Sequence, residues 1–194
     1  LNMKINIASN EVIHFIGIGG IGMSGLAQIM NNMGFIIQGS DLKKNKNTDR
    51  LIKKGIKVYF GHNQKNLSKS TMVVISSAVK KNNKELLAAR NKKLPVFKRG
   101  EMLANIVALK KNIVITGSHG KTTTTSLVAN ILVEAGLDPT VINGGVINSL
   151  KNNAQLGKGE WAVIESDESD GSFLKLPITY SIVTNLDKEH LDFY

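Results

Sequence analysis

Short apolar runs alternate with helical stretches along the chain, and this alternation is typical of an α/β fold with a parallel sheet. In the first half, the apolar runs predict strands at residues 12–16, 35–41, 58–60, 72–75 and 95–97. The helical stretches predict helices at residues 23–33, 84–91 and 101–108, and they place residues 50–54 in another helix. Gly34 and Gly55 follow two of these helices and are expected to end them, because glycine readily adopts the left-handed conformation found there.

The pattern starts again at Asn112. Strands are predicted at residues 113–116, 141–142, 161–164 and 181–184, and a long helix at residues 122–135. About four strands are few for a doubly wound domain. The chain also begins with Leu1 instead of methionine. We therefore expect the sequence to be a piece of a longer protein or a truncated gene product.

The net charge of +10 is concentrated in the first part of the chain. Residues 1–112 contain 20 Lys and Arg against 5 acidic residues, whereas residues 113–194 contain 5 Lys against 10 acidic residues. The charge changes sign where the strand pattern restarts, so we predict two domains, residues 1–110 and 111–194. Because 22 of the 25 basic residues are lysine, we interpret the excess as a solvated surface, with no nucleic-acid partner.

The absence of cysteine excludes disulfides, thiolate zinc sites and a cysteine nucleophile. No apolar run approaches the roughly 18 residues of a transmembrane helix. The N-terminus also lacks the apolar segment of a signal peptide. We therefore expect a cytoplasmic protein without membrane insertion.

A glycine-containing loop with a lysine and two threonines lies between a predicted strand and a predicted helix. It consists of Gly117, Ser118, His119, Gly120, Lys121, Thr122 and Thr123. This order predicts a phosphate-binding loop for ATP, with Lys121 on the phosphates and the Thr122 hydroxyl on Mg²⁺. The general pattern places four residues between the first glycine and Gly-Lys, whereas Gly117 precedes Gly120 by only three positions. A chance Gly-Lys-Thr at a helix start is the alternative, but the flanking strand and helix favour the phosphate loop.

Four acidic residues lie in the segment from Glu165 to Asp170, directly after a predicted strand. Ligand-binding residues gather at the carboxyl ends of parallel strands, and clustered carboxylates repel one another unless a cation is near. We therefore predict a Mg²⁺ site with Glu165 as the ligand, with an acidic solvated turn as the alternative. His190 follows the last predicted strand. A role as a ligand or active-site residue and an ordinary surface position are equally compatible with this placement.

A second glycine loop, at residues 17–22, matches the G-x-G-x-x-G pattern between a predicted strand and a predicted helix. Asp41 lies 19 residues beyond Gly22, at the end of the next predicted strand. The arrangement predicts a site for a diphosphate-bearing nucleotide, with the diphosphate at the helix N-terminus and Asp41 on a ribose or base. It does not specify a nicotinamide cofactor.

Taken together, these motifs resemble the Mur ligase family, and most closely its members that attach L-alanine. The resemblance rests on residues 17–27, 39–41, 76–78, 99–103, 116–125, 143–145, 165–174 and 184–190, in that order. The family's own phosphate loop has the short form Thr-Gly-Thr-x-Gly-Lys-Thr, which accounts for the spacing at Gly117. The resemblance covers essentially the whole chain.

The resemblance implies a Rossmann-like UDP-sugar-binding domain followed by the first part of a P-loop α/β ATP-binding domain. It implies ATP-dependent ligation of L-alanine to UDP-N-acetylmuramate through an acyl phosphate, in peptidoglycan precursor synthesis. ATP and Mg²⁺ are the implied cofactors, with Lys121, Glu165 and His190 catalytic and with Thr122, Glu165 and His190 as metal ligands. The residues it places at the substrate are Gly19, Gly20, Ile21, Gly22, Asp41, His62, Ser77, Ala78, Asn143, Gly144, Ser166, Asp167, Glu168 and Ser169.

Two features depart from the family pattern. Glu189 stands where the family commonly has Asp, and the rest of the ATP domain and the third domain are absent from the sequence. We therefore expect the chain by itself to bind the UDP-sugar without ligating it. Three alternatives remain: a nicotinamide-dependent oxidoreductase, a P-loop switch ATPase, and an inactive remnant that only binds ligands.

Overall fold

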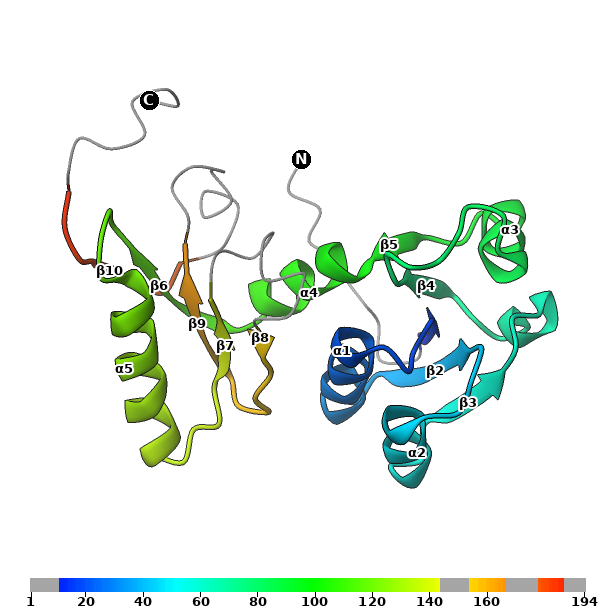
Figure 1. Cartoon of the computed structure of the whole chain (residues 1–194), viewed down its shortest axis with the longest axis horizontal. Helices are drawn as coiled ribbons and strands as arrows, with labels where there is room; N and C mark the ends of the chain where they lie inside the picture. The colour runs from blue at the N-terminus through cyan, green and yellow to red at the C-terminus, as the bar shows by residue number, and fades with distance from the viewer. Residues whose placement is uncertain (1–10, 144–153, 167–177, 187–194) are drawn as a thin grey trace. The chain divides into compact units, whose positions relative to one another are not determined.

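The computed structural model describes residues 11–143, 154–166 and 178–186, and contacts divide the chain into two compact units (Figure 1). The first unit extends to Met102 and the second begins at Leu103, so the division falls within helix α4 (Arg99–Ala108). The expected boundary between residues 110 and 111 stays a prediction. Each unit contains one sheet.

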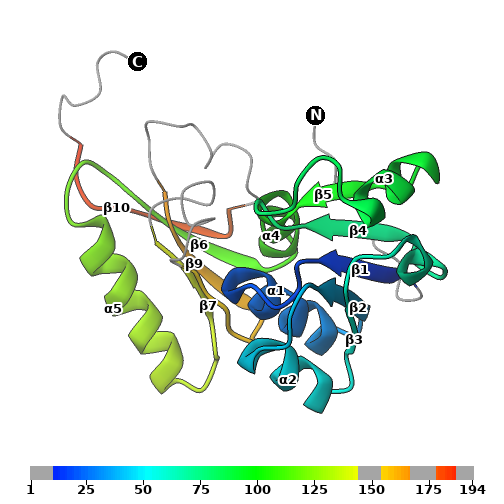
Figure 2. The same cartoon turned by 45° about the vertical axis from the view of Figure 1, so that its right-hand side comes forward.

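The first unit contains a sheet of five parallel strands in the order β3-β2-β1-β4-β5 (Figure 2). The strands are β1 (Val12–Ile16), β2 (Ile36–Asp41), β3 (Lys57–Phe60), β4 (Met72–Ile75) and β5 (Val96–Lys98). The strand order reverses direction between β1 and β4. The loops that follow these two strands therefore leave the sheet in opposite directions and open a crevice at its carboxyl edge.

Helices cover this sheet and complete its core. They are α1 (Ile21–Asn32), α2 (Lys46–Lys53), the short 3₁₀ helix η1 (Gln64–Leu67) and α3 (Lys84–Asn91). Helix α1 contacts β2 and α2, α2 contacts β3, and α3 contacts η1. One core cluster joins β1, β4, η1 and α3 through Ile16, Leu67, Val73, Leu86, Ala88 and Ala89. Burial on both faces explains why β1 reads as a nearly continuous apolar run.

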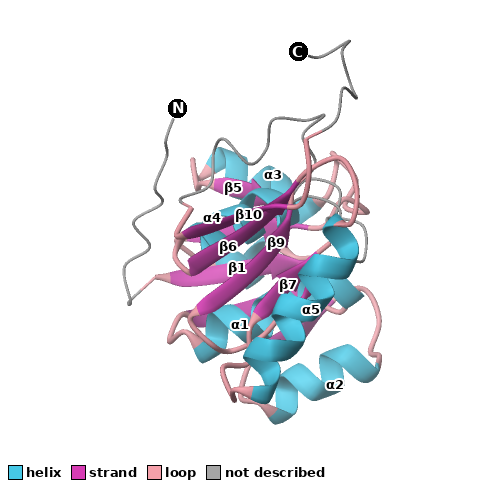
Figure 3. Ribbon diagram, turned by 90° about the vertical axis from the view of Figure 1, so that its left-hand side faces the viewer, coloured by secondary structure: helices cyan, strands magenta, loops and turns pink. Residues whose placement is uncertain are grey.

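The second unit contains a sheet in the order β10-β6-β9-β7-β8. Its strands are β6 (Lys111–Thr116), β7 (Thr140–Ile142), β8 (Ala154–Gln155), β9 (Trp161–Glu165) and β10 (Tyr180–Val183). All neighbouring strands are parallel except β7 and β8. Helix α5 (Lys121–Glu134) follows β6 and lies along one face of the sheet, where it contacts β6 and β9 (Figure 3).

The predicted α/β fold class is confirmed, and two local differences have physical causes. Helix α2 begins at Lys46, before residues 50–54 that the sequence pattern placed in it, because Asn45 caps it. The Asn45 side chain accepts hydrogen bonds from the N–H groups of Asn47 and Thr48, while Thr48 accepts one from the Asn45 N–H. Strand β8 was not predicted, because two residues at the edge of the sheet that pair with β7 leave no apolar pattern.

Candidate functional site

A cavity of about 550 Å³ opens at the carboxyl edge of the first sheet. Its walls are the loops that follow β1, β2, β3 and β4, as the crevice at the strand reversal predicts. The lining residues are Gly17, Gly19, Gly20, Asp41, Leu42, Asn45, His62, Ser76, Ala78, Val79, Lys80, Asn82 and Asn83. Five predicted substrate residues, Gly19, Gly20, Asp41, His62 and Ala78, thus lie together at this cavity. Three others, Ile21, Gly22 and Ser77, are not part of its lining.

Asp41 holds the glycine loop in place. Its Oδ2 accepts a hydrogen bond of 2.8 Å from the N–H of Gly19. A Cβ on residue 19 would lie within 2.9 Å of Asp41, Asn45 and Thr48, so only glycine allows this approach. One oxygen of Asp41 is therefore engaged by the loop itself, whereas sequence reasoning expected the carboxylate on a nucleoside; that role remains a prediction.

Arg99 lies against the start of α1, and sequence reasoning did not select it. A Cβ on Gly22 would lie 2.5 Å from Nη1 of Arg99, so the guanidinium is packed on the first turn of the helix. Burial lowers the pKa of Arg99. In the described part of the chain, Arg99 forms no ion pair with a carboxylate. A cation beside the positive end of a helix dipole is repelled, so this arrangement favours an anion between the two.

A buried polar cluster adjoins the same cavity. Glu85, on the first turn of α3, is fully buried and lies 3.0 Å from Nδ1 of His62 and 3.5 Å from Nε2 of His14. Burial raises the pKa of the Glu85 carboxyl, but hydrogen bonds from His14, Ser40 and Asn66 outweigh it and hold that pKa at about 2. Glu85 is therefore a carboxylate throughout the physiological range.

The predicted phosphate loop lies between β6 and α5 in the second unit. Gly117 has a φ of 128°, and a Cβ there would overlap the Thr184 hydroxyl, so this position requires glycine. The Lys121 ammonium donates hydrogen bonds to the carbonyl oxygens of Gly117 and, at 3.2 Å, of Ser118. In this conformation the lysine is folded over its own loop.

Two of the three predicted metal ligands come together beside this loop. The Thr122 hydroxyl donates a 3.0 Å hydrogen bond to Oε1 of Glu165, which is 8% exposed at the end of β9. Hydroxyl and carboxylate oxygens are the ligands that Mg²⁺ prefers, so this pair fits the ion. The third predicted ligand, His190, lies outside the described residues. Within the described ranges, no three His, Asp or Glu side chains form a metal cluster.

Thr184 and Asn185 fasten the phosphate loop to the end of β10. The Asn185 side chain accepts a 2.9 Å hydrogen bond from the N–H of His119 and donates one of 3.0 Å to the carbonyl of the same residue. The Thr184 hydroxyl donates to that carbonyl at 2.6 Å. Sequence reasoning included Thr184 and Asn185 in a motif but assigned them no role.

Two predicted substrate residues present buried polar atoms at the ends of neighbouring strands. Asn143 follows β7 and Ser166 follows β9, and these strands are paired. Asn143 Oδ1 and Ser166 Oγ are buried, and neither has a hydrogen-bond partner within the part of the chain described here. Buried polar atoms are normally satisfied, so this pair favours a polar ligand. Gly144, Asp167, Glu168 and Ser169 lie outside the described residues.

Comparison with known proteins decides the family. Residues 12–111 match the family described as "Mur ligase family, catalytic domain", and residues 115–194 match the "Mur ligase middle domain". This chain belongs to the Mur ligase family. The first matched range ends and the second begins within β6. The glycine loop at residues 17–22 therefore lies in the first range, and the phosphate loop lies in the second.

Several Mur ligases are similar to this chain over nearly its full length. The UDP-N-acetylmuramate–L-alanine ligase of Pelagibacter ubique is 65% identical over 99% of the chain, and that of Azorhizobium caulinodans is 58% identical over 94%. The crystal structure of UDP-N-acetylmuramate-alanine ligase from Thermotoga maritima superposes over 94% of the chain with a TM-score of 0.62 and 36% identity. The chain spans about two fifths of these proteins: 41%, 39% and 43% of their lengths. Among its described residues, no helix combines the length and the apolar character needed to cross a membrane.

Proposed function

We propose that this chain is the nucleotide-binding part of an ATP-dependent ligase that joins L-alanine to UDP-N-acetylmuramate in peptidoglycan precursor synthesis. The observation that carries the proposal is the 3.0 Å pairing of Thr122 with Glu165 beside the Lys121 loop. A hydroxyl, a carboxylate and an ammonium gathered at a helix N-terminus suit magnesium and a nucleoside triphosphate. The names of the relatives, at 65% and 58% identity, support the choice of reaction.

In the first unit, the cavity and Arg99 support binding of a nucleoside diphosphate. The cavity volume of about 550 Å³ is that of a small-molecule site. The N-terminus of α1 and the guanidinium of Arg99 both favour negative charge at Gly22. We assign the diphosphate of UDP-N-acetylmuramate to the N-terminus of α1, beside the part of the cavity that Gly19 and Gly20 line, and its nucleoside to the side lined by Asp41 and His62.

In the second unit, the phosphate loop would hold ATP. Lys121 would leave the Gly117 and Ser118 carbonyls and bind the phosphate that is transferred to the muramoyl carboxylate. The amine of L-alanine then displaces phosphate from the resulting acyl phosphate. Thr122, Glu165 and His190 would hold Mg²⁺, which neutralises the charge that builds up when two anions meet. Asn143 and Ser166 would contact the substrate with their unpaired buried oxygens.

Hydrogen exchange with separate ligands tests this assignment. We expect UDP to protect amides in the loops after β1 and β4, and MgATP to protect the phosphate loop, because each ligand stabilises the unit that binds it. Protection of the first unit by NADH in place of UDP would favour an oxidoreductase. MgATP protection with no effect of UDP would favour a P-loop ATPase without ligase function. A cytoplasmic location belongs to the same proposal.

A further inference from the structure

The carboxylate of Glu85 is surrounded by hydrogen-bond donors although no solvent reaches it. The Ser40 hydroxyl donates to Oε2 at 2.5 Å, and the Asn66 amide donates to Oε1 at 2.6 Å. His62 Nδ1 lies 3.0 Å from Oε2, and His14 Nε2 lies 3.5 Å from Oε1. The carboxylate also lies at the N-terminus of α3, whose dipole favours a negative charge.

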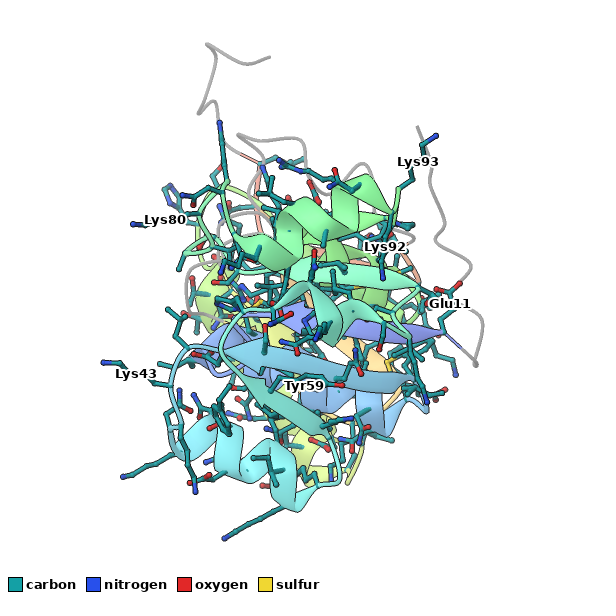
Figure 4. The ribbon with its side chains drawn as sticks, turned by 90° about the vertical axis from the view of Figure 1, so that its right-hand side faces the viewer. Glu11, Lys43, Tyr59, Lys80, Lys92 and Lys93 are labelled. Atoms are coloured by element: carbon teal, nitrogen blue, oxygen red, sulfur yellow. The ribbon has the colours of Figure 1, made fainter. Side chains whose placement is uncertain are left out.

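The tautomer of His14 follows from its other neighbour. Gln38 Nε2 lies 3.3 Å from His14 Nδ1 and also donates to the Asn66 carbonyl at 2.9 Å. The reversed amide orientation would place its oxygen against that carbonyl, so the nitrogen must face His14. Gln38 Nε2 also lies 3.0 Å from Ser70 Oγ, and an amide nitrogen cannot accept a hydrogen bond. Nδ1 of His14 therefore carries no proton, and the ring proton is on Nε2, toward Glu85. The His14 ring also packs against the ring of Tyr59, a residue of β3 that is labelled in Figure 4.

The tautomer of His62 follows in the same way. Its Nδ1 lies 3.0 Å from both Ser40 Oγ and Glu85 Oε2. The Ser40 hydroxyl donates its proton to Glu85. Ser40 Oγ and Glu85 Oε2 can therefore only accept a hydrogen bond from His62. Nδ1 of His62 must carry the proton, and Nε2 is the remaining polar atom of the ring. His62 lines the cavity, its side chain is 15% exposed, and Nε2 has no partner within the described ranges.

We propose that Glu85 is a positioning residue that acts through His62. Its buried carboxylate holds the Nδ1–H of His62 and thereby presents Nε2 to the cavity as a hydrogen-bond acceptor. The group that an acceptor recognises is an N–H or O–H, which a nucleoside offers on its base and ribose and which a diphosphate lacks at neutral pH. This inference rests on the proposed nucleotide site, and it assigns the His62 side of the cavity to the nucleoside.

Long-range ¹H–¹⁵N spectra of the histidine rings test the positioning without any ligand. At pH 8, we expect wild-type His62 to carry its proton on Nδ1, although free neutral histidine prefers Nε2. In Glu85→Gln, one acceptor oxygen becomes an amide group and we expect both tautomers of His62. A wild-type His62 protonated on Nε2 would overturn the proposal. The wild-type spectrum alone tests the hydrogen bond from His62 Nδ1–H to Glu85, so the test stands even if Glu85→Gln does not fold.

A double-mutant cycle tests whether Glu85 acts through His62. We expect Glu85→Gln and His62→Ala each to weaken UDP binding by about fivefold to tenfold, and the double variant to bind no more weakly than His62→Ala. Pyrophosphate binding should be unchanged in all three, because it lacks the nucleoside. Ser70→Ala is the matched control, since Ser70 contacts Gln38 in the same buried cluster without contacting Glu85 or His62.

The outcomes separate this inference from the proposed function. Additive losses in the cycle, or an equal loss for pyrophosphate, would show that Glu85 acts on the fold and not through Nε2. A wild-type chain that binds neither UDP nor pyrophosphate would contradict the nucleotide site and with it the recognition role of Nε2. The tautomer of His62 would still decide whether Glu85 positions the ring. If Glu85→Gln does not fold, Glu85→Asp replaces it in the cycle, because it keeps the charge but withdraws the carboxylate from Nδ1.

Discussion

The hydroxyl of Thr122, at the start of α5, donates a hydrogen bond of 3.0 Å to Oε1 of Glu165, at the end of β9. The two residues come from the phosphate loop and from the neighbouring strand, and the parallel pairing of β6 with β9 brings them to the same edge of the sheet. The carboxylate is almost fully buried, so its negative charge acts on this site and not on bulk solvent.

Replacement of Glu165 by Gln separates the hydrogen bond from the charge. Glutamine can still accept from Thr122, but it is a poor magnesium ligand. We expect the affinity for MgATP to fall about tenfold or more. ATP in EDTA should bind the variant at least as well as the wild type, because a carboxylate without a metal repels phosphate. Calorimetric titration with and without Mg²⁺ measures both.

Glu160→Gln is the control for this experiment. Glu160 lies before the amino end of β9, has a side chain that is 63% exposed, and pairs with Lys111 on the surface. Its replacement should leave both affinities unchanged. Equal losses with and without Mg²⁺ in Glu165→Gln would argue against a metal-binding role.

Replacement of Asn185 by Ala should loosen the phosphate loop. The side chain accepts from the N–H of His119 and donates to its carbonyl, so its loss removes two of the bonds that hold the loop. We expect MgATP affinity to fall about fivefold to tenfold, with faster hydrogen exchange at residues 117–120. Ser181→Ala, on the exposed face of β10, is the control and should change neither quantity. Unchanged exchange in Asn185→Ala would contradict the fastening role.

Replacement of Arg99 by Met should weaken UDP binding. Methionine keeps much of the apolar stem but removes the charge that faces the start of α1. We expect a loss of about tenfold at low salt, and a smaller difference from wild type as the salt concentration rises. Arg90→Met is the control, because Arg90 is exposed on the last turn of α3. A loss that is equal in both variants would indicate a general effect of net charge.

Acid should destabilise the first unit through Glu85. Its pKa is about 2 in the folded chain against 4.5 for an unperturbed carboxyl, so its contribution is complete above pH 4.5 and disappears as the pH falls toward 2. That contribution is of the order of 3 kcal/mol. Glu85→Gln should therefore be less stable than wild type at pH 7, and the difference should shrink between pH 4.5 and 2.

Urea unfolding at several pH values measures this difference. Asp49→Asn is the control in the same unit, since Asp49 forms an exposed ion pair with Lys44 and should contribute less than about 1 kcal/mol. If the difference in the free energy of unfolding between wild type and Glu85→Gln does not change with pH, the variant is destabilised by lost packing and not by loss of the ionised group.

Much of the fold follows from local patterns. Helix α3 occupies the predicted residues 84–91, because Asn83 caps its start and apolar residues repeat along one face. Strands β1 and β4 stand where the apolar runs predicted them. The sequence pattern placed residues 50–54 in α2 without giving its start, because a side-chain cap at Asn45 extends a helix that composition alone does not favour. Such caps depend on a few side-chain hydrogen bonds and leave little trace in periodicity.

The sequence by itself determined where the two glycine loops lie, because each needs a strand before it and a helix after it, and these signals are local. Only the tertiary structure decided which distant residues complete the sites. Asn185 reaches His119 across 66 positions of sequence, Arg99 reaches Gly22, and Glu85 reaches His62. The physical reason is that parallel strands distant in sequence end at one edge of a sheet, so residues that no local spacing relates become neighbours there.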